Sequence, residues 1–447
     1  MSTMSVQTIA LAGDCMLTHP ISVYREEGFL RIRELFSKVD AVFVNFESNI
    51  HNHLDDPFAQ HLGGGSYLTT EPALLSDLKW LGVNLVACGS GHADDYGPKG
   101  VVDTVKYLDQ AGIAHAGSGR HLAEARAPAF IETANGRVAL VATSAQFRLR
   151  AGDQRYDTAG SPGVNGFRHK VVYKVDRSTL DQLRRIGKDI GWEAHKARSR
   201  FQGNPEAAAS DSYDFLGHLF ELGPEFGIAS TPHQVDMEEN LRQVRHARAT
   251  ADRVIVSFHG HELGGPTLFT AQRRSDVEGI ADYAIEFGRK CIDAGADIFV
   301  AHGPQVPMAV EIYRGKPMLH GLGTFIFQIE GVRYLPAEAY ERHQLGERAT
   351  PSDFIERRYA GGARGHAGDP LQWEQMFAIC DFVGPEFEQI RLYPIDLGFA
   401  RPRSQRGRPI LAAAEMGERI LARVQRLSAK YGTKIEQKDG IGIVRGS

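Results

Sequence analysis

The residues best suited to chemistry in this chain are histidines and carboxylates that stand at the ends of apolar runs. Imidazole nitrogens and carboxylate oxygens are the usual protein ligands of divalent metals. In open α/β sheets, ligands bind beyond the carboxyl ends of the strands, so these strand ends together predict a metal site at one sheet edge. Each of four runs is followed by a possible ligand: Thr8–Leu11 by Asp14, Ala41–Phe46 by Glu47, Arg253–Phe258 by His259 and His261, and Asp297–Ala301 by His302.

Taken singly, each of these residues has a simpler interpretation. Asp14 suits a turn or a helix N-cap, because Asp is a preferred cap residue. Glu47 alone could be a surface carboxylate, and each histidine alone could be a buried imidazole that bonds to the backbone. The alternation of a strand nevertheless places Asn45 and Glu47 on one face. It likewise places His259 and His261 on one face, where two imidazoles could share an ion.

A polar loop, Cys88–Gly97, follows another expected strand and contains His92, Asp94 and Asp95. A carboxylate beside a histidine can orient the imidazole and raise its basicity, which prepares it for proton transfer. The alternative interpretation is a solvated loop whose polar side chains take no part in chemistry.

Composition and charge argue against several classes of protein. The formal net charge of the 447 residues is −4, so the overall balance does not favour nucleic acid as a partner. No apolar run approaches the roughly 20 residues of a membrane span, and the N-terminus lacks the pattern of a signal peptide. The four cysteines have no paired spacing, which argues against a zinc ion held by four thiolates and favours reduced core thiols. We therefore expect a cytoplasmic protein.

Strand-like and helix-like segments alternate along the first 150 residues, which is typical of an α/β layer fold. Charged helices are predicted in the stretch from 150 to 245, and residues 331–375 are predicted to be irregular. Two antiparallel strands and an amphipathic helix at Ile410–Tyr431 are predicted to close the chain. We expect one domain over residues 1–447, with its core in 7–150 and 251–330. Residues 151–250 would be an insertion that covers the site, and residues 331–447 an extension that completes the fold.

The motifs also occur in a recognisable order. They are Gly13-Asp14, Asn45-Phe46-Glu47, His92-Ala93-Asp94-Asp95-Tyr96-Gly97, Ser257-Phe258-His259-Gly260 and the run from Asp297 to Pro304. From about residue 7 to 328 the chain resembles the bacterial CapA-like family of poly-γ-glutamate capsule synthesis, which is related to calcineurin-like metallophosphoesterases. The resemblance implies a four-layer α-β-β-α sandwich of metallophosphatase type with large insertions.

The resemblance also implies roles for individual residues. Asp14, Glu47, His259 and His302 would bind one or two divalent ions of Mn, Fe or Zn. His92 would be the proton donor or would stabilise the transition state, and Asp95 would hold it in place.

Three positions depart from the family pattern. Gly91 stands where an Asn ligand is common, Gln305 where a His is common, and Thr324 where an Asn is common. His261 is an additional imidazole on the same face as His259, and it could replace a missing ligand. A site with one metal, or a rearranged site, is consistent with these changes.

A metal-activated water is the natural nucleophile for this ligand set, so we expect a soluble metal-dependent hydrolase. Its substrate would be an anionic small molecule or oligomer, cleaved at an amide or peptide-like bond or at a phosphoester, and the family relationship favours a γ-glutamyl type. The alternative is a non-catalytic protein of capsule or polyglutamate biosynthesis on a degenerate scaffold.

Five arginines could bind the anionic substrate, although each could equally be a solvated surface charge: Arg148, Arg150, Arg168, Arg273 and Arg274.

Overall fold

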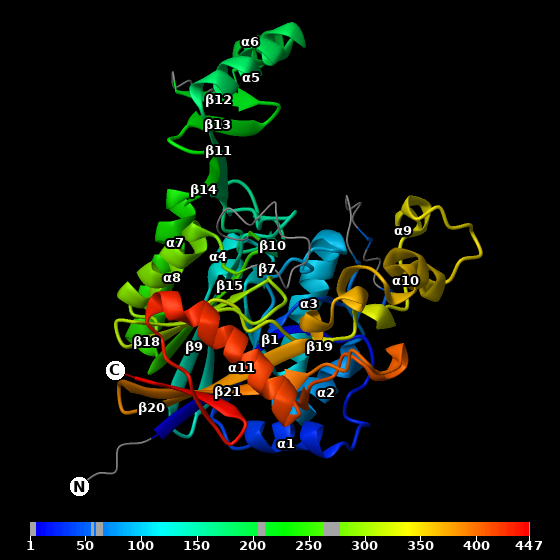
Figure 1. The fold of residues 1–447 in the computed structure, drawn as a ribbon, viewed down its shortest axis with the longest axis vertical. Coiled ribbons are helices and arrows are strands. Elements are labelled where there is room, and N and C mark those ends of the chain that lie inside the picture. The colour runs from blue at the N-terminus through cyan, green and yellow to red at the C-terminus, as the bar shows by residue number, and fades with distance from the viewer. Residues whose placement is uncertain (1–5, 55–57, 60–65, 204–210, 263–277, 447) are drawn as a thin grey trace.

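The computed structural model describes residues 6–54, 58–59, 66–203, 211–262 and 278–446. Two large mixed sheets form the body (Figure 1). The ten-stranded sheet has the order β23 (Glu436–Lys438), β24 (Ile441–Arg445), β21 (Glu386–Asp396), β20 (Glu374–Val383), β1 (Val6–Met16), β2 (Ala41–Phe46), β5 (Leu85–Ala87) and β6 (Ala114–Ala116). In addition, β19 (Thr324–Phe327) pairs with β1, and β22 (Ile410–Leu411) pairs with β21.

The six-stranded sheet contains the two strands that end in histidines. Its order is β17 (Val310–Tyr313), β18 (Lys316–Leu319), β16 (Ile298–His302), β15 (Arg253–His259), β9 (Gly136–Ser144) and β8 (Ala129–Thr133). The strands β9, β15, β16 and β18 run parallel to one another, so their carboxyl ends meet at one edge.

The two sheets pack face to face over one buried cluster. Ile9 and Leu11 of β1 and Ile255 and Ile298 of the second sheet belong to this cluster. The alternate residues point outward, where helices cover them. On the ten-stranded sheet these helices are α1 (Glu27–Phe36) and α2 (Leu75–Leu81), and on the six-stranded sheet they are α7 (Gln234–Thr250) and α8 (Asp282–Asp293). This mixed α/β arrangement confirms the predicted α/β class, while the metallophosphatase type of the sandwich stays a prediction.

Several smaller elements complete the body. The strands β3 (Asn49–Ile50) and β4 (Thr69–Thr70) pair with each other, as do β7 (Ser118–Gly119) and β10 (Gly163–Val164). The helices α3 (Gly97–Ala111) and α4 (Leu122–Arg126) follow in the same half of the chain. Helix α11 (Ala414–Ser428) buries Ile420, Leu421 and Val424 in the cluster between the sheets, as its predicted amphipathic spacing requires. The predicted start at Ile410 is wrong, because Ile410 and Leu411 pair with β21 as a strand.

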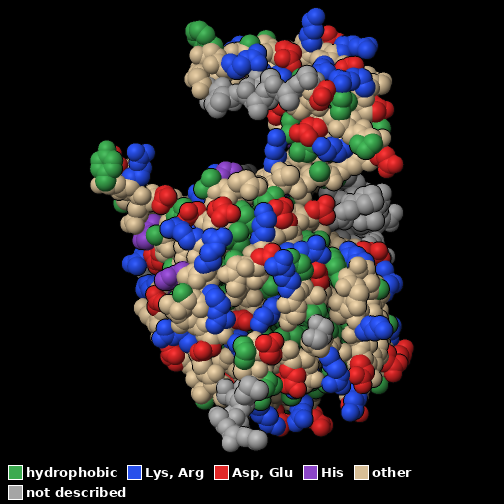
Figure 2. Space-filling model, turned by 90° about the vertical axis from the view of Figure 1, so that its left-hand side faces the viewer, with side chains coloured by type: hydrophobic (Ala, Val, Ile, Leu, Met, Phe, Trp, Pro, Cys, Tyr) green, Lys and Arg blue, Asp and Glu red, His purple; other side chains and the backbone are tan. Residues whose placement is uncertain are grey.

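The stretch predicted as charged helices contains a small sheet as well. Helices α5 (Arg177–Asp189) and α6 (Trp192–Phe201) lie beside a four-stranded sheet of β12 (Ser212–Phe215), β13 (His218–Leu222), β11 (His169–Val175) and β14 (Gly227–Pro232). These elements form a lobe, within residues 169–203 and 211–232, that projects from the body (Figure 1). Figure 2 shows the lobe standing over the body with an open recess beneath it.

The prediction of irregular structure for residues 331–375 is wrong in part. Helices α9 (Ala337–Arg342) and α10 (Pro351–Tyr359) lie in this segment. A capping box starts α10, because the Thr350 hydroxyl accepts from the backbone of Asp353 and the Asp353 carboxylate accepts from the backbone of Thr350. Pro351 at the first helical position adds to this signal.

The cysteines and the apolar content of the helices are also subjects of prediction. All four cysteines, at 15, 88, 291 and 380, are buried and form no disulfide, as predicted. Within the described ranges, no helix is both long and apolar enough to cross a bilayer.

Candidate metal centre

A β-bulge in β1 directs Asp14 between the two sheets. From Leu11 to Asp14 the strand β1 advances three residues, while its partner β2 advances two, from Phe43 to Asn45. The additional residue places Asp14 on the same face as Leu11. Gly13 permits this path, because a Cβ atom there would lie 2.1 Å from the carbonyl oxygen of Gly323.

Three strand ends meet around Asp14. Asn45 Nδ2 donates to Asp14 Oδ1 at 2.8 Å and lies 3.1 Å from His259 Nδ1. His302 Nδ1 lies 3.5 Å from Asp14 Oδ1. All four side chains are buried. Among the described residues, neither Asp14 Oδ2 nor His302 Nε2 has a hydrogen-bond partner. Buried polar atoms are usually satisfied, so the donor chemistry of these two atoms fits a metal ion.

A second group of donors adjoins the first through His259. The Nε2 atom of His259 lies 3.5 Å from Glu47 Oε1 and 3.2 Å from His261 Nε2. Glu47 Oε1 and His261 Nε2 are 3.9 Å apart. One donor atom from each of these residues lies within 4.8 Å of the others. This carboxylate and two imidazoles match the donor types that bind Zn, Mn or Fe.

The pKa shifts of His259 and Asp14 favour the protonation states that bind a cation. Burial, and then the charge of His261, hold the pKa of His259 well below its usual value, so its imidazole is neutral and has a lone pair to offer. Burial raises the pKa of Asp14, but contact with His302 and the hydrogen bond from Asn45 outweigh it and leave the pKa lowered. A buried carboxylate that stays ionised beside the neutral imidazole of His259 fits a divalent ion.

Gly91 lies directly against the imidazoles. A Cβ atom at this position would be 3.3 Å from His259 Nε2 and 3.5 Å from His261 Nε2. A side chain at position 91 would therefore point into the space beside the two rings. In this chain the ring of His261 occupies the neighbouring space.

The next residue, His92, forms the predicted pair with Asp95. His92 Nδ1 donates to Asp95 Oδ2 at 2.7 Å, and the same carboxylate oxygen accepts from the backbone of Leu68. Arg148 Nη1 lies 3.1 Å from Asp94 and 3.5 Å from Asp95. Because Nδ1 is engaged, Nε2 is the ring nitrogen that His92 can offer to a substrate.

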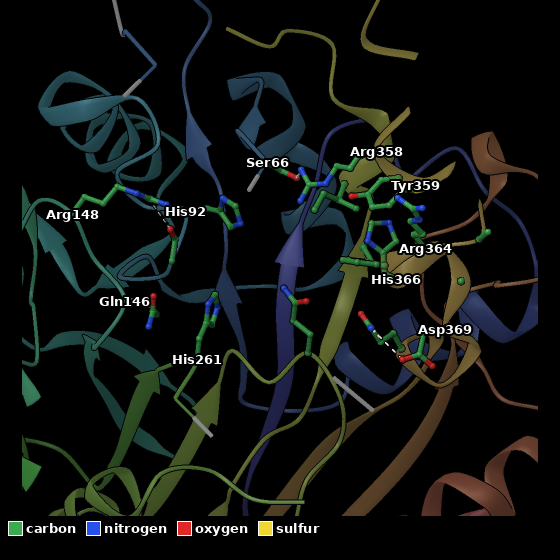
Figure 3. A pocket seen from close by; sticks show the side chains of 18 residues that line it. Ser66, His92, Gln146, Arg148, His261, Arg358, Tyr359, Arg364, His366 and Asp369 are labelled. Atoms are coloured by element: carbon green, nitrogen blue, oxygen red, sulfur yellow. Dashed lines mark hydrogen bonds between the residues drawn. The ribbon is translucent and has the colours of Figure 1, made fainter. Parts of the chain in front are cut away.

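A pocket of about 730 Å³ opens beside these residues (Figure 3). One wall carries His92, His261, Gln146 and Arg148. The opposite wall comes from α10 and the turns after it, and Figure 3 shows its cationic and aromatic side chains facing the histidines. These residues, which sequence reasoning did not identify, are Arg358, Tyr359, Arg364 and His366.

The other predicted anion-binding arginines lie elsewhere. Arg168 donates to Asp236 at 2.7 and 2.9 Å, and Arg150 contacts the same carboxylate at 3.4 Å. Neither lines the pocket, so their ion pairs are a structural link to α7. Arg273 and Arg274 lie outside the described residues.

Residues 8–329 match the family described as "Bacterial capsule synthesis protein PGA_cap". The chain belongs to this family. The resemblance inferred from the motifs is thereby confirmed. Two proteins of Sinorhizobium fredii, named "Uncharacterized protein y4sH" and "Uncharacterized protein y4uA", are each 30% identical over 98% of this chain and 93% of their own length.

A more distant relative comes from Mycobacterium tuberculosis. It is named "Probable polyglutamine synthesis accessory protein Rv0574c", and it is 25% identical over 56% of this chain and 46% of its own length. The crystal structure of a hypothetical protein from Thermus thermophilus is 11% identical, with a TM-score of 0.38 over 87% of this chain and 99% of that chain.

Proposed function

We propose that this PGA_cap protein is a metal-dependent hydrolase with a metallophosphatase-type α-β-β-α sandwich. The observation that carries the proposal is the convergence of buried donors from both sheets, beside a pocket that His261 lines. Glu47, His259 and His261 would hold one ion. Asp14 and His302, with their unsatisfied atoms, would hold a second ion or complete the coordination of the first.

A divalent ion, when bound, supplies Lewis acidity and makes water a stronger nucleophile at neutral pH. The protein would do the rest. Asn45 fixes the orientation of the Asp14 carboxylate through its hydrogen bond. Asp95 fixes the ring of His92, which would give a proton to the leaving group from Nε2. His92 lines the pocket, so its ring can reach a substrate there.

The substrate class follows from the cationic side chains of the pocket. Arg148, Arg358 and Arg364 line it, so an anionic substrate would be attracted and oriented. Arg358 is positioned by a 2.9 Å hydrogen bond to Ser66. An amide or peptide-like bond of the γ-glutamyl type, or a phosphoester, would suit the metal chemistry. The family description and the word "polyglutamine" in the name of the mycobacterial relative favour the amide.

Metal analysis of the purified protein tests the proposal. We expect at least one equivalent of Mn, Fe or Zn, and we expect His259→Ala to lose metal together with hydrolysis of γ-glutamyl peptides or of an aryl phosphate. His320→Ala is the matched control, since His320 is also buried but bonds to Glu311 away from the site. Less than half an equivalent of metal, with no activation by added ions, would contradict the proposal.

A second candidate function is a non-catalytic accessory role in polymer synthesis. Gly91 offers no ligand, Gln305 stands in place of the expected imidazole, and the mycobacterial relative is named an accessory protein. In that case the protein would bind anionic polymer, and His259→Ala would leave the affinity for polymer unchanged.

A further inference from the structure

Helix α6 of the lobe has an unusual surface for a helix that lies near a sheet. Such a helix normally buries an apolar stripe. Helix α6 has no buried residue at all. The face formed by positions 192, 195, 196, 199 and 200 carries one tryptophan and four polar side chains: Trp192, His195, Lys196, Ser199 and Arg200. Trp192 packs against the small apolar cluster of the lobe that contains Val175, Leu180 and Tyr213, and the rest of this face is polar.

The same face lines a groove of about 600 Å³. The facing wall comes from β11, where His169, Val171 and Tyr173 alternate along the strand. His218 and Leu219 at the start of β13 also line it. A groove of this size exceeds what one water or inorganic ion fills, and its walls combine ring faces with polar groups, as ligand sites do.

The groove carries more positive than negative charge. Lys170, Lys196 and Arg200 line it, and Asp214 is the sole carboxylate among its lining residues, while Lys196 pairs with Glu193 at 2.9 Å beside it. Within the described part of the chain, Lys170 forms no ion pair, and its side chain is exposed. Helices α5 and α6 add to the positive charge around the groove, because positions 177 to 201 contain seven Lys and Arg residues and three Asp and Glu residues.

The groove contains a fixed aromatic platform. The Trp192 indole stacks on the His195 ring, with the ring centroids 4.9 Å apart and the planes at 13°. Its Nε1 donates to the carbonyl oxygen of Asp214 at 2.9 Å. The indole is therefore held in one orientation at the groove wall, where its fluorescence would report a bound ligand.

The end of the groove at His169 adjoins the pocket that His92 and His261 line, called the metal pocket from here on. His169 stacks on Tyr283, and its Nε2 atom lies 3.6 Å from Glu262 Oε1. Glu262 accepts a 2.6 Å hydrogen bond from Gln146, which lines the metal pocket. From His169 to Tyr173 the strand extends about 13 Å, at roughly 3.3 Å per residue. An extended chain bound along β11 would thus run from the lobe toward the metal pocket.

We propose that the lobe groove is a second binding site for the substrate, and that this substrate is an extended oligomer of carboxylates. One unit would lie in the metal pocket while later units contact Lys170, Arg200 and the imidazoles of the groove. Single exposed charge pairs contribute little, so the affinity would build up with the number of carboxylates. This inference rests on the proposed function for the identity of the ligand, although binding to the groove does not require hydrolysis.

Binding can be measured on the metal-free full-length protein through the fluorescence of Trp192. The probes are glutamate and oligo-glutamates of five and ten residues. We expect saturable quenching by the ten-residue chain, with a Kd at least tenfold lower than that of the five-residue chain, and no quenching in Trp192→Phe. The double variant Lys170→Glu with Arg200→Glu should raise the Kd of the ten-residue chain at least tenfold.

The matched control is Lys188→Glu with Arg198→Glu. It makes the same charge change on α5 and α6, but neither residue lines the groove. We expect less than a twofold change in Kd at 0.15 M salt, where the screening length is about 8 Å. Equal losses in both double variants, absence of saturable quenching, or tighter binding of a single-stranded oligonucleotide would each overturn the inference. Absence of metal or hydrolysis with intact quenching would refute the proposed function and leave the groove as a polyanion site.

Discussion

The Nε2 atoms of His259 and His261 lie 3.2 Å apart, with Glu47 Oε1 within 3.9 Å of both. Two imidazole nitrogens at this distance share one hydrogen bond if one of them carries the proton. A cation between them would satisfy both lone pairs and the carboxylate. We propose that His261 takes the place that a side chain at position 91 would have beside His259.

The first prediction is therefore an exchange of ligands between positions 91 and 261. His261→Ala should weaken metal binding by more than about 10- to 100-fold, the range for losing a group that only supports a ligand, because it removes a proposed ligand itself. Gly91→Asn alone should also weaken it, because the new Cβ atom would lie 3.3 Å from His259 Nε2. The double variant should bind metal better than His261→Ala, because the Asn oxygen would enter the vacated space. Titration calorimetry with Mn²⁺ and Zn²⁺ measures this, and additive losses would contradict it.

The second prediction separates proton transfer from metal binding. His92→Ala should lower kcat by about 10²- to 10⁴-fold, the range for loss of a general acid, with metal content unchanged. Asp95→Asn should have a smaller effect in the same direction, because it weakens the hydrogen bond that orients the ring. Metal analysis accompanies the kinetics. Loss of metal in His92→Ala would show that this histidine is a ligand and not a proton donor.

The third prediction concerns the buried carboxylate of Asp236, which contacts the guanidinium groups of Arg126, Arg150 and Arg168. Asp236→Asn would leave Arg150 and Arg168 without this counter-charge and Arg126 with Glu239 alone, at 3.7 Å, at a cost of about 3 kcal/mol of unfolding free energy. Urea denaturation measures the loss. Asp181→Asn is the control, because Asp181 forms an exposed pair with Arg184 that is expected to contribute under about 1 kcal/mol.

The same variant has a defined pH dependence. Burial raises the pKa of Asp236, but the hydrogen bonds and charge of Arg168 and the charge of Arg150 outweigh it and leave the pKa lowered. A carboxylate with a lowered folded-state pKa stabilises the protein fully above its usual pKa and loses this contribution as the pH falls through the folded value. The difference between the natural protein and Asp236→Asn should thus shrink below about pH 4, the usual carboxyl range. A difference that stays constant down to about pH 2.5, well below that range, would contradict the assignment.

The strand ends of this fold could be predicted from sequence, and the path of Asp14 could not. Apolar runs such as Ala41–Phe46 are buried on both faces, so their length and composition identify them as strands. Strict alternation would place Asp14 on the outer face with Ala12, and the bulge reverses this. The reason lies in a contact with Gly323, more than 300 residues away, which no local pattern encodes.

The second wall of the pocket was also beyond sequence reasoning. Arg358 and Arg364 look like ordinary surface charges, and only the packing of α10 beside the sheet edge brings them opposite His92. The start of α10 itself can be predicted from sequence, because Thr350 and Asp353 form a capping box and Pro351 stands at the first helical position. In the lobe, strands such as β12 and β13 are short and only partly buried, so their alternation was too weak to identify.

The fourth prediction is a loss of stability in mild acid that depends on His51. Burial, and then the charges of His53 and Lys99, lower the pKa of His51 to about 3. The unfolded chain binds a proton near pH 6.5 while the folded protein does not, so stability falls as the pH drops from about 6.5 toward 3. One proton corresponds to a slope of at most about 1.4 kcal/mol per pH unit. His51→Gln should flatten this slope in urea denaturation between about pH 6.5 and 4. An unchanged slope would assign the acid sensitivity to other groups.

The fifth prediction tests the cationic wall of the metal pocket. Arg364 lines the pocket and, among the described residues, forms no ion pair, so its charge is available to a substrate. Arg364→Ala should raise KM for an anionic substrate by about 5- to 10-fold, equivalent to roughly 1–1.4 kcal/mol, and leave kcat within about twofold, because uniform binding is lost. Arg357→Ala is the matched control, since Arg357 lies in α10 but does not line this pocket. The effect should weaken in high salt and vanish for a neutral analogue. Equal changes in KM for both variants would show that these arginines attract the substrate only through the overall positive charge of the surface.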